Sequence, residues 1–172
     1  MELKGKRIII LIENMYNEFE FWYPYYRLQE AGVQVVVVGA GESRYTSKFG
    51  IPVTPDEEVN NLKMADFDGV VIPGGYAPDI MRRHPAMVQL VRDAHDAGKI
   101  VAAICHAGWM LASANILANR RVTSFFAIKD DLIHAGAHWT DEPVVRDGNL
   151  ITSRKPDDLP AFMRTILEAL AQ

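Results

Sequence analysis

Short apolar runs alternate with longer amphipathic runs along this chain, and this alternation is the feature that most limits how it can fold. Apolar stretches of strand length cover residues 7–12, 33–38, 69–72 and 100–104. Segments with helical periodicity cover residues 18–31 and 85–97, and each is followed by a glycine suited to ending a helix. Strands and helices in this order are typical of βαβ units, whose strands form a parallel sheet covered on both faces.

The rest of the chain completes this pattern. Residues 42–54 contain Gly50 and Pro52 and predict a hairpin or an irregular excursion. Two short extended pieces, at 144–145 and 150–152, flank a turn, and a final helix is expected over residues 157–171. We therefore expect an α/β fold of the flavodoxin-like type, with a doubly wound, mostly parallel sheet sandwiched by helices in a single domain over residues 1–172.

The charge distribution argues against two classes of partner. The chain has 18 basic and 22 acidic residues, a formal net charge of −4, and its lysines and arginines are scattered. Such a chain lacks the basic patch that nucleic acids or anionic membranes require. No apolar stretch reaches the ~20 residues of a membrane span. With one cysteine there is no internal disulfide, which fits a reducing compartment, and we expect a cytoplasmic protein.

Cofactor and metal sites are not expected. The segment after the first strand, residues 13–18, is acidic and bulky where a flavodoxin would cradle a phosphate, and no G-x-G-x-x-G fingerprint is present. His134 and His138 have the spacing of a metal-binding pair, but no acidic third ligand accompanies them. The sequence thus predicts chemistry carried out by side chains.

The only cysteine, Cys105, stands where the apolar run 100–104 turns into a helix-like run. A helix start aims N–H groups and a positive dipole end at the sulfur, which predicts a lowered thiol pKa, and His106 follows directly. The alternative is a buried structural cysteine. Two further features, the stretch 13–20 and the Pro73-Gly74-Gly75 turn, follow other strands of the same sheet. Because catalytic groups collect at the carboxyl ends of parallel strands, this convergence favours catalysis.

Several neighbours suit a nucleophilic cysteine. The backbone N–H groups of Gly75 and His106 are candidates for an oxyanion hole. Glu18 and Glu20 either lie in solvent at a helix start or point into the site, and a carboxyl beside a thiolate would have to be protonated. Six aromatic residues between positions 19 and 26 exceed what one core can bury, which predicts a homodimer or a higher homo-oligomer.

At these residues the chain resembles the ThiJ/PfpI superfamily, the intracellular cysteine peptidases and protein deglycases of the flavodoxin-like fold. The resemblance covers nearly the whole chain. It is carried by Glu20-Phe-Trp-Tyr-Pro24, Val71-Ile-Pro-Gly-Gly75, the elbow Ala103-Ile-Cys-His106 and the segment 152–162. It implies that Cys105 is the nucleophile, His106 its catalytic neighbour, Glu20 the carboxyl bonded to the thiol, and the amides of Gly75 and His106 the oxyanion hole.

The resemblance also implies that an acidic residue after the glycine turn enters the neighbouring subunit's site to orient the histidine, and here that position is Asp79. This chain departs from the family pattern in four places. Asp79 stands in place of glutamate, Asn17 in place of an additional glutamate, Phe125 in place of a tyrosine, and Ala107-Gly108 in place of Gly-Pro or Gly-Ala. The alternative role for Asp79 is to cap a short helix.

These observations predict a cysteine-dependent hydrolase of the PfpI type, a stress enzyme whose thiolate attacks a carbonyl. The substrate is a peptide or a small carbonyl compound, as in peptidase, glyoxalase or protein deglycase activity, and the residues do not choose between them. The alternative is a redox sensor or stress-protective holdase that oxidises Cys105 reversibly.

Overall fold

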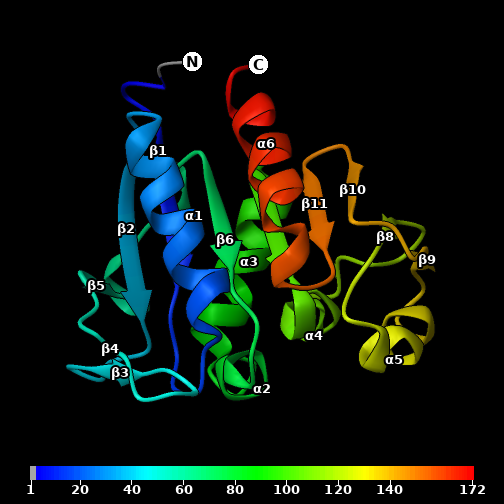
Figure 1. The fold of residues 1–172 in the computed structure, drawn as a ribbon, viewed down its shortest axis with the longest axis horizontal. Helices are drawn as coiled ribbons and strands as arrows, with labels where there is room; N and C mark the ends of the chain where they lie inside the picture. The colour runs from blue at the N-terminus through cyan, green and yellow to red at the C-terminus, as the bar shows by residue number, and fades with distance from the viewer. Residues whose placement is uncertain (1–2) are drawn as a thin grey trace.

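Seven strands form one central sheet in the computed structural model, which describes residues 3–172 (Figure 1). Their spatial order is β10-β11-β7-β6-β1-β2-β5. Strand β10 runs antiparallel to β11, and every other neighbouring pair is parallel. The predicted flavodoxin-like architecture, a mostly parallel sheet between helices, is confirmed.

The element bounds follow the apolar runs closely. The central sheet comprises β1 (Arg7–Leu11), β2 (Gln34–Gly39), β5 (Glu57–Glu58), β6 (Gly69–Ile72), β7 (Ile100–Ile104), β10 (Val144–Asp147) and β11 (Leu150–Ser153). Two small ribbons pair β3 (Tyr45–Thr46) with β4 (Pro52–Val53) and β8 (Arg121–Val122) with β9 (His138–Trp139). The helices are α1 (Glu18–Glu30), α2 (Ala77–Met81), α3 (Pro85–Asp96), α4 (Gly108–Ser113), α5 (Lys129–His134) and α6 (Leu159–Leu170).

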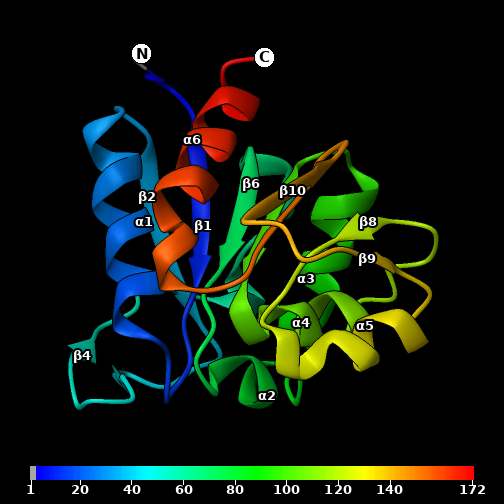
Figure 2. The ribbon, with the colours of Figure 1, turned by 45° about the vertical axis from the view of Figure 1, so that its right-hand side comes forward.

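Helices cover both faces of the sheet. Helices α1 and α6 contact each other and pack on β2, β7 and β11, whereas α3 packs on β6 and β7 from the opposite face (Figure 2). Residues Ile8 to Ile12 are completely buried, as are Val70 to Ile72. Burial on both faces explains why these strands are continuous apolar runs without polar alternation.

Two expected boundaries shift for identifiable reasons. Helix α1 ends at Glu30, because Gly32 takes the left-handed conformation (φ +84°) just beyond the Ala31 cap. The last helix begins at Leu159, two residues later than expected, because Pro156–Asp158 form a separate 3-10 turn. The excursion at 42–54 is the predicted hairpin.

The carboxyl ends of β1, β6 and β7 lie at one edge of the sheet. The β3–β4 hairpin, α2 and α4 lie at this same end of the molecule (Figure 1). The fold therefore brings the segments after β1, β6 and β7 together, as expected for a parallel sheet. Throughout residues 3–172, no helix has both the length and the apolar composition needed to cross a membrane.

Candidate active site

Cys105 occupies a sharp turn between β7 and α4. Its backbone has φ +62°, in the left-handed region that L-residues avoid, at a cost of roughly 1–2 kcal/mol. A 3-10 turn, Cys105–Ala107, follows directly and leads into α4. This elbow lifts the side chain out of the strand direction and leaves the sulfur near the N–H groups that begin the turn.

The glycine turn after β6 lets three backbone segments approach one another. Gly75 has φ +78°, and a Cβ there would lie 2.6 Å from the backbone nitrogen of Asn17. A Cβ on Gly74 would lie 2.7 Å from the Cβ of Cys105 and would overlap Glu20 Oε2. Only residues without a Cβ allow this turn to lie against both α1 and the elbow.

Glu20 is the carboxyl that enters the site. It is fully buried, and the backbone N–H of Gly74 donates to its Oε2 at 2.8 Å. Its other oxygen, Oε1, has no hydrogen-bond partner among residues 3–172. Burial raises the pKa of Glu20 to about 7, against the lowering effects of the Gly74 N–H and the Cys105 thiol. Near neutral pH this carboxyl is therefore partly protonated.

Glu18 forms a hydrogen bond with the hairpin segment instead. The backbone N–H of Phe49 donates to Glu18 Oε1 at 2.7 Å, and the side chain is buried. Neither glutamate at the start of α1 is therefore a solvated helix-start residue. The first turn of α1 is fixed by Asn17, whose side chain accepts from the N–H groups of Phe19 and Glu20.

The predicted lowering of the thiol pKa is wrong. Burial, and next the negative charge of Glu20, raise the pKa of Cys105 to about 12. The backbone N–H groups of His106 and Gly75 act in the opposite direction and lower this pKa. Because two adjacent negative charges are disfavoured in this buried site, a thiolate forms most readily when Glu20 holds the proton.

His106 lies beside the sulfur. Its Nδ1 is 3.2 Å from Cys105 Sγ, and its ring stacks on Phe125 at a centroid distance of 5.0 Å. The ring of Trp109 is 5.1 Å away on a tilted plane. Burial lowers the pKa of His106, so the imidazole is neutral at neutral pH. A neutral ring with its proton on Nε2 accepts the thiol proton at Nδ1.

Asp79 lies on α2 and forms an ion pair with Arg83 of the same chain. Its hydrogen bond with this guanidinium lowers the pKa of the Asp79 carboxyl. Among residues 3–172, no carboxylate lies within 4.0 Å of His106. The structure therefore brings Cys105, His106, Glu20 and Gly75 together in one chain and leaves Asp79 outside this group.

These groups open into a cavity of about 350 Å³, a volume typical of small-molecule sites. It is lined by Met15, Asn17, Glu20, Lys48, Gly75, Tyr76, Cys105, His106, Trp109, Phe125, Lys155 and Pro156. The sequence analysis did not identify Lys48 or Lys155 as site residues. Lys155 lies two residues after the end of β11, so its place near the carboxyl end of a parallel strand was the signal available. For Lys48 the sequence contained no such signal, because only the fold of the hairpin brings this residue to the site.

Metal-binding groups are not a feature of the part of the chain that the structure describes. Residues 3–172 contain no cluster of three or more His, Cys, Asp or Glu side chains arranged around a common point. The donor groups in the cavity are one thiol, one imidazole and one carboxyl that is already bonded to Gly74.

A cysteine on a strand-to-helix elbow, with a buried glutamate and a glycine turn against it in an α/β sandwich, defines a class of cysteine proteins. The model of the DJ-1/PfpI family matches residues 6–169, and the chain belongs to this family. It is 39% identical over 164 residues to Deglycase PfpI of Pyrococcus furiosus, covering 95% of this chain and 99% of that protein. It is 38% identical to Protein/nucleic acid deglycase 2 of Escherichia coli, covering 96% and 98% of the two chains.

A solved structure shares the whole fold. The Anabaena variabilis protein with DJ-1/ThiJ/PfpI-like and ferritin-like domains superposes with a TM-score of 0.95 and 43% sequence identity. The match covers 96% of this chain and 50% of that longer, two-domain chain. The similarity therefore concerns one half of the Anabaena protein.

Proposed function

We propose that this protein is a cysteine-dependent enzyme that adds the Cys105 sulfur to the carbonyl of a small aldehyde or of its adduct with a thiol or amine. The observation that carries this proposal is the position of Glu20, a fully buried carboxyl with a pKa of about 7 beside the only cysteine. Such a group is suited to protonate the oxygen of a carbonyl while sulfur adds to the carbon. The deglycase names of two relatives support the same chemistry.

The reaction needs no external oxidant when the substrate is a 2-oxoaldehyde. Sulfur addition to the aldehyde carbon gives a hemithioacetal, whose oxygen receives a proton from Glu20 near the N–H groups of Gly75 and His106. Transfer of a proton from the first carbon to the second, and of the hydroxyl proton from the first oxygen to the second, then gives a thioester. Water hydrolyses this thioester, which releases a 2-hydroxycarboxylate and returns the thiol. The first carbon is oxidised and the second reduced, so the net change is the addition of one water. His106 Nδ1, 3.2 Å from the sulfur, takes the thiol proton first.

This chemistry fits a single chain better than peptide hydrolysis does. A peptidase must protonate an amine leaving group with an imidazolium that an acidic partner stabilises. His106 has no carboxylate partner among residues 3–172, and its pKa is lowered. In carbonyl addition the oxygen is protonated by Glu20, which lies in the same chain as Cys105, and His106 has no amine leaving group to protonate. The deglycase names of the relatives likewise do not favour a non-enzymatic redox sensor.

The test is turnover with purified protein. We expect the methylglyoxal hemithioacetal of N-acetylcysteine amide to be converted to free thiol and lactate, and Cys105→Ala to lose this activity by at least a hundredfold. A panel of fluorogenic peptides measures peptidase activity in parallel. Equal turnover by Cys105→Ala and the unmodified protein would refute the assigned nucleophile, and cleavage of peptides alone would favour the peptidase.

A further inference from the structure

The cavity around Cys105 carries an uneven distribution of charge. Its basic side chains are Lys48 and Lys155, and its only acidic side chain is Glu20. Glu20 is buried at the base of the site and accepts the N–H of Gly74. Two lysines thus line the cavity, and its only acidic side chain is one that a proton neutralises near neutral pH.

Lys48 is held at this cavity by the backbone of the β3–β4 hairpin. Its own N–H donates to the carbonyl of Tyr16 at 3.0 Å, and the next N–H, that of Phe49, donates to Glu18. The hairpin is therefore bonded at Lys48 and at the next residue to the end of the β1–α1 connection and the start of α1. These bonds fix the backbone position from which the Lys48 side chain extends.

The ammonium group of Lys48 has no ion-pair partner in the part of the chain described. It lies 5.6 Å from the centroid of the Phe49 ring, and no carboxylate of residues 3–172 is within 4.0 Å of it. The charge of Lys48 contributes to lowering the pKa of Glu18, whose Oε1 accepts the N–H of Phe49 and which forms no ion pair with Lys48. A cation that borders a reactive cavity without a partner is free to bind an anionic group of a ligand.

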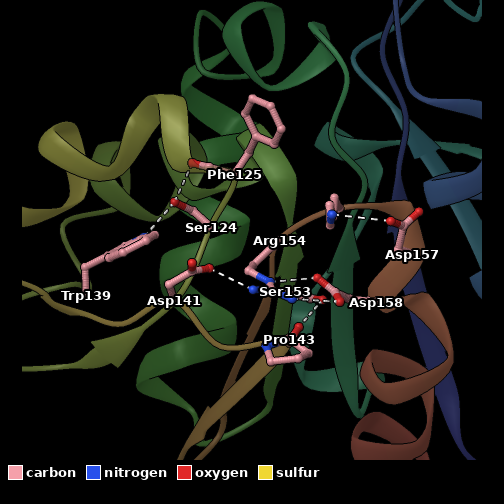
Figure 3. A network of polar contacts seen from close by, with 10 residues as sticks. Ser124, Phe125, Trp139, Asp141, Pro143, Ser153, Arg154, Asp157 and Asp158 are labelled. Atoms are coloured by element: carbon pink, nitrogen blue, oxygen red, sulfur yellow. Dashed lines mark hydrogen bonds and ion pairs between the residues drawn. The ribbon is translucent and has the colours of Figure 1, made fainter.

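Lys155 reaches the same cavity from the loop between β11 and α6. The preceding residue, Arg154, anchors this loop: its guanidinium donates to Asp158 at 2.9 and 3.1 Å and to Asp141 at 2.7 Å (Figure 3). Lys155 itself pairs with Asp157 at 3.3 Å, but both side chains are largely exposed. Exposed pairs of this kind contribute little, so a ligand can compete for the lysine.

We propose that Lys48 and Lys155 form an anion subsite that selects substrates bearing a carboxylate close to the reacting carbonyl. This inference rests on the proposed carbonyl chemistry for its biological meaning, because it names the substrate class of the same cavity. The two lysines come from separate loops, each anchored by its own set of bonds. An incoming carboxylate meets them beside Cys105, and a 2-hydroxycarboxylate product carries the same charge.

Alkylation of the single cysteine tests the subsite without any turnover. Iodoacetate and iodoacetamide transfer the same carbon to sulfur and differ only in a carboxylate. We expect the ratio of their rate constants at Cys105 to exceed that for N-acetylcysteine by about fivefold at low salt, the size of one or two exposed ion pairs. The thiol pKa cancels in this ratio at a fixed pH.

Variants identify the source of the preference. We expect Lys48→Gln with Lys155→Gln to bring the ratio within twofold of that for N-acetylcysteine, and Lys48→Arg to retain it. The matched control is Lys63→Gln, an exposed lysine outside the cavity, which should keep the full preference. A ratio for the unmodified protein equal to that of N-acetylcysteine, or a double variant that keeps the preference, would overturn the subsite.

A second measurement separates this proposal from the proposed function. Methylglyoxal hemithioacetals of N-acetylcysteine and of its amide differ in the same way as the two alkylating agents. A higher kcat/KM for the carboxylate form, lost in the double variant, supports both proposals. An alkylation preference without turnover of either hemithioacetal supports the subsite and contradicts the carbonyl chemistry.

Discussion

Glu20 and Cys105 lie in the same buried site, and this determines how each side chain titrates. Both side chains are buried, and the negative charge of an ionised Glu20 raises the pKa of Cys105. Replacing Glu20 by Gln keeps an acceptor for the Gly74 N–H but removes that charge. We therefore expect Glu20→Gln to move the midpoint of Cys105 alkylation to lower pH.

The matched control for this change is Glu18→Gln. Glu18 is on the same first turn of α1, but it bonds to Phe49 and does not line the cavity. Its replacement should leave the alkylation midpoint where it is. If Glu18→Gln moves the midpoint and Glu20→Gln does not, the carboxyl has been assigned to the wrong residue. Iodoacetamide kinetics up to pH 12 compare both variants with the unmodified protein, and a lower midpoint is seen as faster alkylation at every pH below it.

Glu20 also makes stability depend on pH. Its pKa is about 7 in the folded chain, against 4.5 for a glutamate in water, so the folded state binds the proton more tightly. The associated stability is complete below pH 4.5 and is lost as pH rises through 7. The loss amounts to about 3 kcal/mol, since one pKa unit corresponds to about 1.4 kcal/mol.

Urea denaturation at pH 4.5 and pH 8 measures this effect. We expect the free energy of unfolding of Glu20→Gln to exceed that of the unmodified protein by about 3 kcal/mol more at pH 8 than at pH 4.5. Other titrating groups contribute equally to both proteins and cancel in this difference. An equal pH dependence for the two proteins would show that Glu20 is not held in a buried, proton-binding form.

At the scale of the element, the turn from β7 into α4 stores backbone strain at Cys105. Glycine adopts the left-handed conformation without the Cβ penalty. We therefore expect Cys105→Gly to be more stable than Cys105→Ala by about 1 kcal/mol, the reverse of the usual order of these residues within regular structure. Both variants lack the sulfur, so the comparison isolates the backbone. Thermal or urea unfolding of the pair provides the measurement, and a more stable alanine variant would contradict a strained elbow.

Elements with a clear apolar period were predictable, and the short ones were not. The four apolar runs that form β1, β2, β6 and β7 could be identified as strands because burial on both faces makes a strand continuously apolar. Strands β8 and β9 contain two residues each, too few for any period, so the segment between α4 and β10 could not be assigned. The convergence of Glu20, Gly75 and Cys105 followed from parallel topology alone.

Properties that depend on burial depth and on long-range contacts could not be predicted from the sequence. A helix start favours a thiolate, but the degree of desolvation at Cys105 and the nearby charge of Glu20 outweigh it. The choice between Glu18 and Glu20 required the hairpin, which binds one of them. Lys48 reaches the cavity only because this same hairpin folds back on the segment after β1.

At the scale of the whole molecule, α1 presents an aromatic surface that the single chain leaves uncovered. Phe19, Tyr23 and Tyr26 are 66%, 40% and 61% exposed and lie on successive turns of the helix. We expect this surface to contribute to a homo-oligomer, because aromatic side chains are enriched where subunits meet. Sedimentation velocity should give a dimer or a larger species, and replacing Phe19 and Tyr26 by Ser should shift it toward monomer. A monomer for the unmodified protein at micromolar concentration would contradict this prediction.

An oligomer would also give Asp79 a role that it does not have within one chain. Asp79 is only partly exposed, pairs with Arg83 and does not approach His106 of its own chain, whereas His106 lacks the acidic partner that would stabilise an imidazolium. We therefore expect Asp79 to reach His106 of the neighbouring subunit.

Mixing inactive Cys105→Ala with inactive Asp79→Ala subunits, after dissociation and reassembly, should restore about a quarter of the sites in a random 1:1 mixture. Cys105→Ala mixed with His106→Ala is the control, because those two residues belong to one chain's site and no activity should return. Full turnover by Asp79→Ala alone, or no recovery in the mixed oligomers, would show that Asp79 only pairs with Arg83 and stabilises α2.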